Sequence, residues 1–198
     1  MQKGGATVCW VFDLDDTLMP TRAVFHNPKV RRILSHAQRV GQPDEAARRR
    51  RFVQAYQRIV SADPPLVSAI TQLRGMKVLL TNGSRDHAYA SLSALRLLPH
   101  FYGQLDRDSG VGMKPNPTMY DTLHQHVLQE QRRTSPSSAP VSFIFFDDLE
   151  QNLVYPRQLQ WTTVWITGAQ QRPRRHLPHV NYMFRTVHEA LAFFSNRN

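Results

Sequence analysis

Four short runs of apolar, β-branched and aromatic residues restrict the fold of this chain more than any other feature. They occupy residues 7–14, 76–81, 142–146 and 162–166. Their apolarity is nearly continuous, which predicts strands covered on both faces, as in a parallel sheet. Helical patterns separate them, at residues 65–73, 85–97 and 117–128, and residues 104–106 suggest a short extra strand. This alternation predicts an α/β fold: a Rossmann-like parallel sheet with helices on both faces.

Size and composition agree with one globular domain that carries a small insert. The chain has 198 residues, of which 41% are hydrophobic, so it is neither disordered nor too short to bury a core. Its single cysteine, Cys9, excludes an intrachain disulfide framework. No apolar run reaches the roughly 18 residues of a membrane span, and no signal-peptide core precedes the first strand. We therefore expect a cytoplasmic protein with no membrane partner.

Basic charge is concentrated in two parts of the chain. The formal net charge is +10. Residues 22–58 hold ten basic side chains against two acidic ones, and residues 157–185 hold five arginines and no acid. Residues 22–63 fall outside the strand–helix alternation and resemble two basic helices separated by Gly41-Gln42-Pro43. We predict a main α/β unit formed by residues 1–19 and 64–198, with a small helical insert, or cap, at residues 20–63.

Carboxylates follow two of the predicted strands. The first apolar run leads into Asp13-Leu14-Asp15-Asp16, and the third is followed by Asp147-Asp148. Ligands bind at the carboxyl edge of an open parallel sheet, where these strand ends meet. Asp13 and Asp15 lie two positions apart, so an extended backbone points them the same way, whereas we expect Asp16 to cap a turn. Such an oxygen-rich edge suits Mg²⁺.

The second strand and a later turn add groups that suit an anion. Thr81-Asn82-Gly83-Ser84 stands just before a helix and offers a hydroxyl and backbone N–H groups. Lys114 follows a glycine-rich turn and could supply a fixed positive charge. Metal, anion cradle, lysine and paired carboxylates together make a phosphoryl-transfer site.

These motifs carry a family resemblance that extends across roughly residues 7–166. They occur in the order Phe12-Asp13-Leu14-Asp15-Asp16-Thr17-Leu18, Thr81-Asn82-Gly83, Lys114-Pro115 and Phe146-Asp147-Asp148. Order and spacing resemble the four motifs of the haloacid dehalogenase (HAD) superfamily of phosphatases. The resemblance implies a HAD-like fold, Mg²⁺ as cofactor and hydrolysis of a phosphate ester.

The resemblance also implies a role for each matching residue. Asp13 matches the nucleophile that forms an aspartyl-phosphate, and Asp15 matches the general acid and base. Because dehalogenating members lack an acid at the Asp15 position, its presence favours a phosphatase. Lys114 matches the residue that neutralises charge on the nucleophile and the phosphoryl group. Two further sets follow: phosphate binding by Thr81 and Asn82, and Mg²⁺ binding by Asp13, the main-chain carbonyl of Asp15, Asp147 and Asp148.

A narrower resemblance concerns the substrate. The chain is similar to the pyrimidine 5′-nucleotidase branch in Thr81-Asn82-Gly83-Ser84-Arg85-Asp86-His87-Ala88, Lys114-Pro115-x-Pro117-x-x-Tyr120, Phe146-Asp147-Asp148-x-x-x-Asn152-Leu153 and Thr162-Thr163-Val164-Trp165. It implies a small phosphorylated substrate such as a nucleoside 5′-monophosphate. Within this motif we interpret His87 as a helix or core histidine rather than a catalyst.

Two other functions stay open at this point. A short basic cap could leave the site open to a macromolecule, either a nucleic-acid end or a phosphoprotein. A non-catalytic nucleic-acid-binding or regulatory protein is the second alternative, although every motif position needed for turnover is filled. The sequence does not indicate an oligomeric state.

Overall fold

A computed structural model describes residues 7–28, 30, 32, 44–134, 140–169 and 176–195. Its centre is a six-stranded parallel sheet in the order β3-β2-β1-β4-β5-β6. The strands are β1 (Thr7–Phe12), β2 (Met76–Leu80), β3 (Gly103–Leu105), β4 (Val141–Asp147), β5 (Thr162–Ile166) and β6 (Tyr182–Phe184). The predicted fold class is therefore confirmed, including the short strand near residue 104, while β6 was not predicted.

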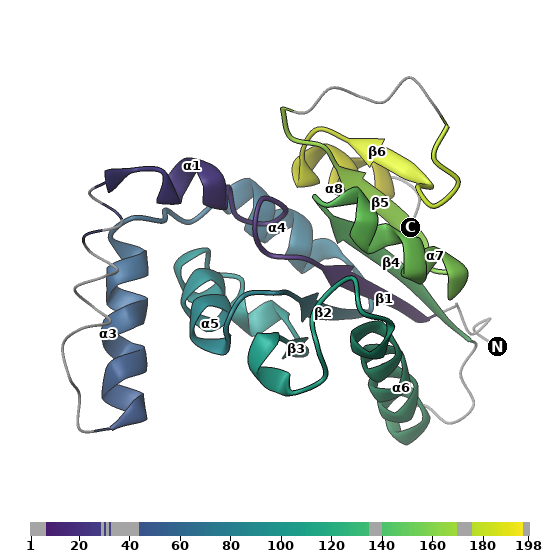
Figure 1. Cartoon of the computed structure of the whole chain (residues 1–198), viewed down its shortest axis with the longest axis horizontal. Helices are drawn as coiled ribbons and strands as arrows, with labels where there is room; N and C mark the ends of the chain where they lie inside the picture. Colours follow the sequence, from purple (N-terminus) through teal and green to yellow (C-terminus); the bar gives the residue numbers. More distant parts are fainter. Residues whose placement is uncertain are drawn as a thin grey trace.

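Helices lie on both faces of this sheet, and two more, α1 (Thr21–Phe25) and α3 (Glu45–Gln57), lie beyond its end (Figure 1). The other helices in the described part of the chain are α4 (Pro64–Gln72), α5 (Arg85–Ala94), α6 (Pro117–Thr134), α7 (Val154–Gln158) and α8 (Val187–Ser195). Short 3-10 turns are η1 (Leu98–His100), η2 (Arg107–Ser109) and η3 (Glu150–Leu153). Among the described residues, no helix combines the length and apolarity that a membrane crossing requires.

The alternation of side chains along β1 divides the core into two layers. Trp10 and Phe12 face one layer, in which the apolar sides of α4, α5 and α8 are buried. Cys9 and Val11 face the other, which α6 and α7 cover. All four side chains are fully buried. A strand buried on both faces needs a nearly continuous apolar sequence, which explains the pattern of residues 7–14.

The register of the central strands positions the site. Phe12 of β1 pairs with Phe146 of β4 and with Leu79 of β2. The backbone N–H of Asp13 then donates to the carbonyl oxygen of Phe146 at 2.9 Å. Asp13 and Asp147 consequently stand side by side at the carboxyl edge of the sheet.

The described part of the region predicted as a cap includes the helices α1 and α3. In Figure 1, α3 lies beside α5 at the end of the molecule opposite α6. Asp44 begins α3, because its side chain accepts a hydrogen bond from the backbone N–H of Ala47 at 2.6 Å. The predicted break at residues 41–43 lies outside the described residues. The division at residues 20–63 stays a prediction.

Candidate active site

Lys114 links two of the predicted carboxylates. Its Nζ lies 2.6 Å from Oδ1 of Asp13 and 2.6 Å from Oδ2 of Asp147. The side chains of Lys114 and Asp147 are 1% and 0% exposed, so this ion pair is almost free of solvent screening. The structure thus joins the ends of β1 and β4 to the turn that precedes α6.

A third carboxylate completes a cluster at this edge. Oxygen atoms of Asp13, Asp147 and Asp148 all lie within 4.8 Å of one another. The second oxygen of Asp147 is used structurally, since it accepts hydrogen bonds from the N–H of Leu149 at 2.8 Å and from the side chain of Asn152 at 2.9 Å. Asp13 also has both oxygens in hydrogen bonds, Oδ1 with Nζ of Lys114 and Oδ2 with the hydroxyl of Thr17 at 3.3 Å.

The charges in this cluster do not balance. Burial raises the pKa of Asp13 to about 8 even though the ammonium group of Lys114 lowers it. Burial, with the charges of Asp147 and Asp16, raises the pKa of Asp148 to about 7. Burial lowers the pKa of Lys114, but the two carboxylates on its Nζ outweigh that effect and raise it. Three acids around one ammonium group leave negative charge that a hard divalent cation would offset, so the donor set fits Mg²⁺.

The predicted phosphate-binding residues lie at the end of β2. Thr81 is fully buried, and its Oγ1 accepts a hydrogen bond from the N–H of Gly83 at 3.0 Å. The side chain of Asn82 is turned to Lys114: its Oδ1 accepts from the backbone N–H of Lys114 at 2.8 Å, and its Nδ2 donates to the Lys114 carbonyl at 2.9 Å. Asn82 therefore positions the lysine with its side chain and has only its backbone left for an anion.

Asp15 has two hydrogen-bond donors, neither of which was predicted from the sequence. Its Oδ1 accepts from Oγ1 of Thr21 at 2.6 Å and from Nε2 of His87 at 2.7 Å. Burial raises the pKa of Asp15, but the hydrogen bonds from His87 and Thr21, together with the charge of Lys114, outweigh it and hold the pKa below its usual range. The interpretation of His87 as a histidine outside the chemistry overlooked this contact. The available signal was its place in the first turn of a helix that directly follows Thr81-Asn82-Gly83.

Asp16 acts as the sequence indicated. It has a left-handed φ of 58°, and its Oδ1 accepts from the backbone N–H of Arg22 in the first turn of α1 at 2.9 Å. The guanidinium group of Arg22 bridges Asp16 and Asp148, at 2.8 Å and 3.3 Å. Arg22 thereby ties α1 to the carboxylate cluster.

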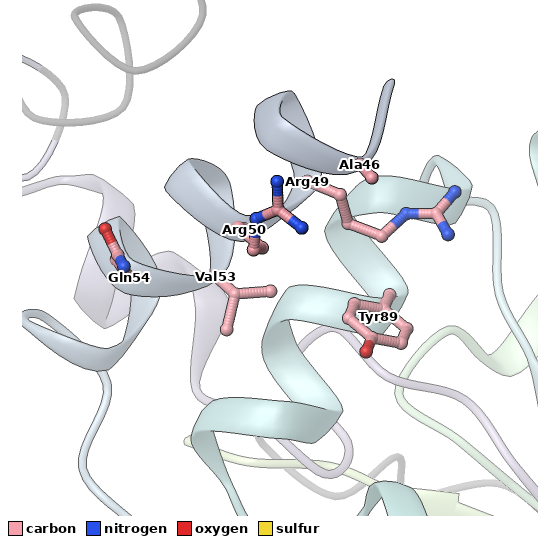
Figure 2. Close-up of a pocket in the computed structure, with 6 residues that line it drawn as sticks. All are labelled: Ala46, Arg49, Arg50, Val53, Gln54 and Tyr89. Atoms are coloured by element: carbon pink, nitrogen blue, oxygen red, sulfur yellow. The ribbon is translucent and has the colours of Figure 1, made fainter. Parts of the chain in front are cut away.

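The basic helix α3 meets α5 at a surface pocket (Figure 2). The pocket has a volume of about 430 Å³ and is lined by Ala46, Arg49, Arg50, Val53, Gln54 and Tyr89. Arg49 is not simply solvated, because its Nε lies 3.3 Å from Asp86 and its guanidinium carbon 5.4 Å from the centre of the Tyr89 ring. These contacts hold α3 against the helix that carries His87.

Solved structures with the same architecture identify the fold. An L-2-haloacid dehalogenase from Xanthobacter autotrophicus matches over 97% of this chain and 100% of its own, with a TM-score of 0.58 and 13% identity. A structure from Thermotoga maritima assigned as a beta-phosphoglucomutase matches over 96% and 99%, with a TM-score of 0.65 and 15% identity. The chain has the haloacid dehalogenase fold.

A third structure with this fold contains metal. It is a HAD-hydrolase from Bacillus subtilis bound to magnesium, matched over 96% of this chain and 99% of its own, with a TM-score of 0.58 and 14% identity. No family model matches the sequence, and no curated protein does. The haloacid dehalogenase fold therefore rests on structure, and the activity has to be argued from the site.

Proposed function

We propose that the protein is a Mg²⁺-dependent phosphomonoesterase that works through an aspartyl-phosphate on Asp13. The observation that carries the proposal is the pair of acids at the end of β1. Asp13 is buried, pairs with Lys114 and belongs to the carboxylate cluster with Asp147 and Asp148. Asp15 instead accepts hydrogen bonds from Thr21 and His87. Two carboxylates in such different surroundings suit two different roles, nucleophile and proton carrier.

In the first half of the reaction, a carboxylate oxygen of Asp13 attacks phosphorus. The bond from phosphorus to the ester oxygen breaks, and that oxygen takes a proton from Asp15. Lys114, 2.6 Å from Asp13, orients the nucleophile and stabilises negative charge on the transferred group. Thr81 and the backbone N–H groups after it would hold the phosphoryl oxygens.

In the second half, Asp15 removes a proton from water, which attacks the phosphorus of the aspartyl-phosphate. The bond between Asp13 and phosphorus breaks, and inorganic phosphate leaves with Asp13 restored. The lowered pKa of Asp15 favours the carboxylate that this step needs. A bound phosphate dianion raises the pKa of Asp15 through like-charge repulsion, and so favours the protonated Asp15 that the first half of the reaction needs.

Mg²⁺ would be held by Asp13, Asp148, Asp147 and the main-chain carbonyl of Asp15. When bound, it supplies charge neutralisation for the phosphate and the acids around it. The B. subtilis structure with this fold is bound to magnesium, and the X. autotrophicus structure has chloropropionic acid covalently bound. The first supports Mg²⁺ binding on this fold and the second a covalent intermediate, and the acid at position 15 favours phosphate esters as substrates.

A nucleoside 5′-monophosphate or a similar small ester is the substrate that we propose. The motif resemblance to pyrimidine 5′-nucleotidases supports it, as does the basic charge of α3, the helix whose Tyr56 contacts His87 beside Asp15. If exposed arginines such as Arg50 contact the rest of a nucleotide, Arg50→Gln should reduce kcat/KM for the nucleotide and leave p-nitrophenyl phosphate unchanged. Arg157→Gln, which removes an exposed charge from α7, away from α3 (Figure 1), is the matched control.

The decisive test is hydrolysis of phosphate esters by the purified protein. We expect release of inorganic phosphate with Mg²⁺, loss of release in EDTA, and recovery when Mg²⁺ is added back. Full activity in EDTA would contradict the metal assignment. Activity restricted to oligonucleotide ends, with a steep fall as salt rises, would favour a nucleic-acid substrate instead.

A further inference from the structure

Three side chains from separate elements form a continuous hydrogen-bonded chain. Asp15 Oδ1 lies 2.7 Å from Nε2 of His87, at the start of α5, and Nδ1 of the same ring lies 2.5 Å from the hydroxyl of Tyr56, in α3. Tyr56 is 2% exposed. The chain therefore runs from a predicted catalytic acid, through the core, to the basic helix.

The donor and acceptor groups of Asp15, His87 and Tyr56 determine where the protons in these hydrogen bonds lie. A carboxylate only accepts, so Nε2 of His87 must donate to Asp15. In a neutral ring Nδ1 is then an acceptor, and the phenol of Tyr56 is its donor. Burial and the nearby charge of Asp15 raise the pKa of Tyr56, which keeps its hydroxyl protonated. Tyr56 thus fixes the tautomer and the orientation of the His87 ring.

The geometry leaves one oxygen of Asp15 for chemistry. Thr21 and His87 both donate to Oδ1. Among the described residues, no side chain donates to Oδ2. A Cβ placed on Gly83 would lie 3.6 Å from this Oδ2, 3.3 Å from Oγ1 of Thr81 and 2.7 Å from Cδ2 of His87. Oδ2 and the Thr81 hydroxyl therefore face a common space, and the absence of a side chain at position 83 makes room for the imidazole.

We propose that His87 and Tyr56 are positioning residues that hold the Asp15 carboxylate with Oδ2 toward the substrate for proton transfer. This rests on the phosphatase function proposed above. Neither residue gains or loses a proton in the reaction: the proton moves from Oδ2 of Asp15 to the leaving oxygen while the hydrogen bonds at Oδ1 persist. Two donors on one oxygen restrict rotation of the carboxylate. Such restriction increases the rate of a reaction that requires one orientation of the catalytic group.

Because Tyr56 belongs to α3, the orientation of the Asp15 carboxylate depends on the position of α3. Phe25 and Phe52 pack around the Tyr56 ring, with ring centroids at 6.0 and 5.0 Å. Arg49 anchors the other end of α3 to α5 through Asp86. If α3 moves away from α5, the bond between Tyr56 and His87 breaks, and the carboxylate loses its support. The basic helix would then govern whether the proton carrier is aligned.

Leaving-group dependence separates this role from a general structural one. An alkyl phosphate needs a proton on its leaving oxygen, whereas p-nitrophenolate departs without one. General acid–base help is typically worth about 10²–10⁴-fold. Partial misalignment in Tyr56→Phe should therefore lower kcat/KM for glycerol 2-phosphate about 10-fold. We expect a loss of kcat/KM of less than about twofold for p-nitrophenyl phosphate, because kcat/KM reports only the steps up to departure of the leaving group and not the later attack of water, in which Asp15 serves both esters as base.

Matched variants complete the experiment. Tyr89→Phe removes a phenol hydroxyl from the contact between α3 and α5 but leaves the hydrogen bonds between Asp15, His87 and Tyr56 intact. Its kcat/KM for both esters should match that of the wild type. His87→Gln keeps an amide N–H that can reach Asp15, so it should retain more alkyl phosphatase activity than His87→Leu. If His87→Leu does not fold, Tyr56→Phe and Tyr89→Phe still decide the question.

The outcomes distinguish the two proposals. Equal loss on both esters in Tyr56→Phe, or no loss on either, overturns the positioning role while the phosphatase function stands. A wild-type protein that hydrolyses neither ester with Mg²⁺ overturns the phosphatase function, and the positioning role falls with it. A selective loss on the alkyl ester, absent in Tyr89→Phe, supports both.

Discussion

Asn82 and Lys114 hold each other by two reciprocal hydrogen bonds, 2.8 and 2.9 Å long, between the side-chain amide of Asn82 and both backbone polar groups of Lys114. The two residues are 32 positions apart in the chain. The pair fixes the backbone at Lys114, and the ammonium group can then reach Asp13 and Asp147 together. An asparagine expected at a phosphate-binding loop therefore also sets the place of the lysine that we propose to be catalytic.

Asn82→Ala should impair turnover more than binding. It leaves the N–H and carbonyl of Lys114 without partners, at a cost of about 1–3 kcal/mol for each buried group. The lysine then loses its alignment with Asp13, so we expect kcat to fall by about 10-fold or more with little change in KM. Steady-state kinetics on p-nitrophenyl phosphate measure this. Asn116→Ala, which alters the next turn without touching Lys114, is the control, and an equal loss there would contradict the argument.

Asp13→Asn should abolish phosphatase activity and preserve the fold. The amide has the same shape but is a far weaker nucleophile, and Lys114 keeps its ion pair with Asp147. We expect near-wild-type thermal unfolding in EDTA and a smaller rise of Tm on adding Mg²⁺, because one ligand is weakened. Phosphate release and calorimetry on the same sample test both parts. Wild-type turnover in this variant would exclude a covalent intermediate on Asp13.

The metal-free protein should lose stability as pH rises toward neutrality. The folded-state pKa values of Asp13 and Asp148 are raised to about 8 and about 7 from an ordinary 3.8. Between pH 3.8 and about 8 the folded state binds more protons than the unfolded state, so the free energy of unfolding falls as pH increases. Lys114 does not contribute here, since its raised pKa acts above 10.5. Tm measured in EDTA across this range gives the slope.

Mg²⁺ and one variant provide the controls for that slope. Mg²⁺ binds deprotonated carboxylates, so its stabilising effect on Tm should grow as pH rises. Asp148→Asn removes one of the two raised groups and should flatten the decline in EDTA. A slope that is unchanged in Asp148→Asn would show that other groups cause it.

The sequence predicted what depends on local pattern and strand order. Continuous apolar runs marked β1 and β4, and their shared register brought Asp13 beside Asp147 as expected for a parallel sheet. β6 was not predicted, although β3, which is equally short, was. The side chains of Tyr182–Phe184 are all half-buried, and the place of this strand is set by pairing with β5.

Long-range side-chain contacts were beyond the sequence for a different reason. His87 and Asp15 are 72 positions apart, and Tyr56 and His87 are 31 apart. Their contact requires α3 to pack on α5, and helix periodicity gives no partner for a helix. The motif residues could be found because they follow strand ends, whereas their supporting residues come from the packing of helices.

Gln160 is strained at the end of α7. It has a left-handed φ of 61°, its N–H donates to the carbonyl of Arg157 at 3.1 Å, and the N–H of Trp161 donates to the carbonyl of Pro156 at 3.0 Å. This pair of bonds is a Schellman motif, in which glycine is the usual residue at the left-handed position. Because the Trp161 side chain is buried, the turn cannot relax by moving its following residue.

Replacing Gln160 with glycine should stabilise the protein. A left-handed conformation costs a residue with a Cβ about 1–2 kcal/mol, while the greater freedom of glycine in the unfolded chain offsets roughly half of that gain. We expect Gln160→Gly to raise the free energy of unfolding by about 0.5–1 kcal/mol. Urea denaturation should show a higher midpoint with an unchanged m value. Gln160→Ala keeps the Cβ and should gain nothing, and Gln158→Gly, inside the helix, should lose stability. If Gln160→Gly were no more stable than Gln160→Ala, backbone strain at this position would not limit stability.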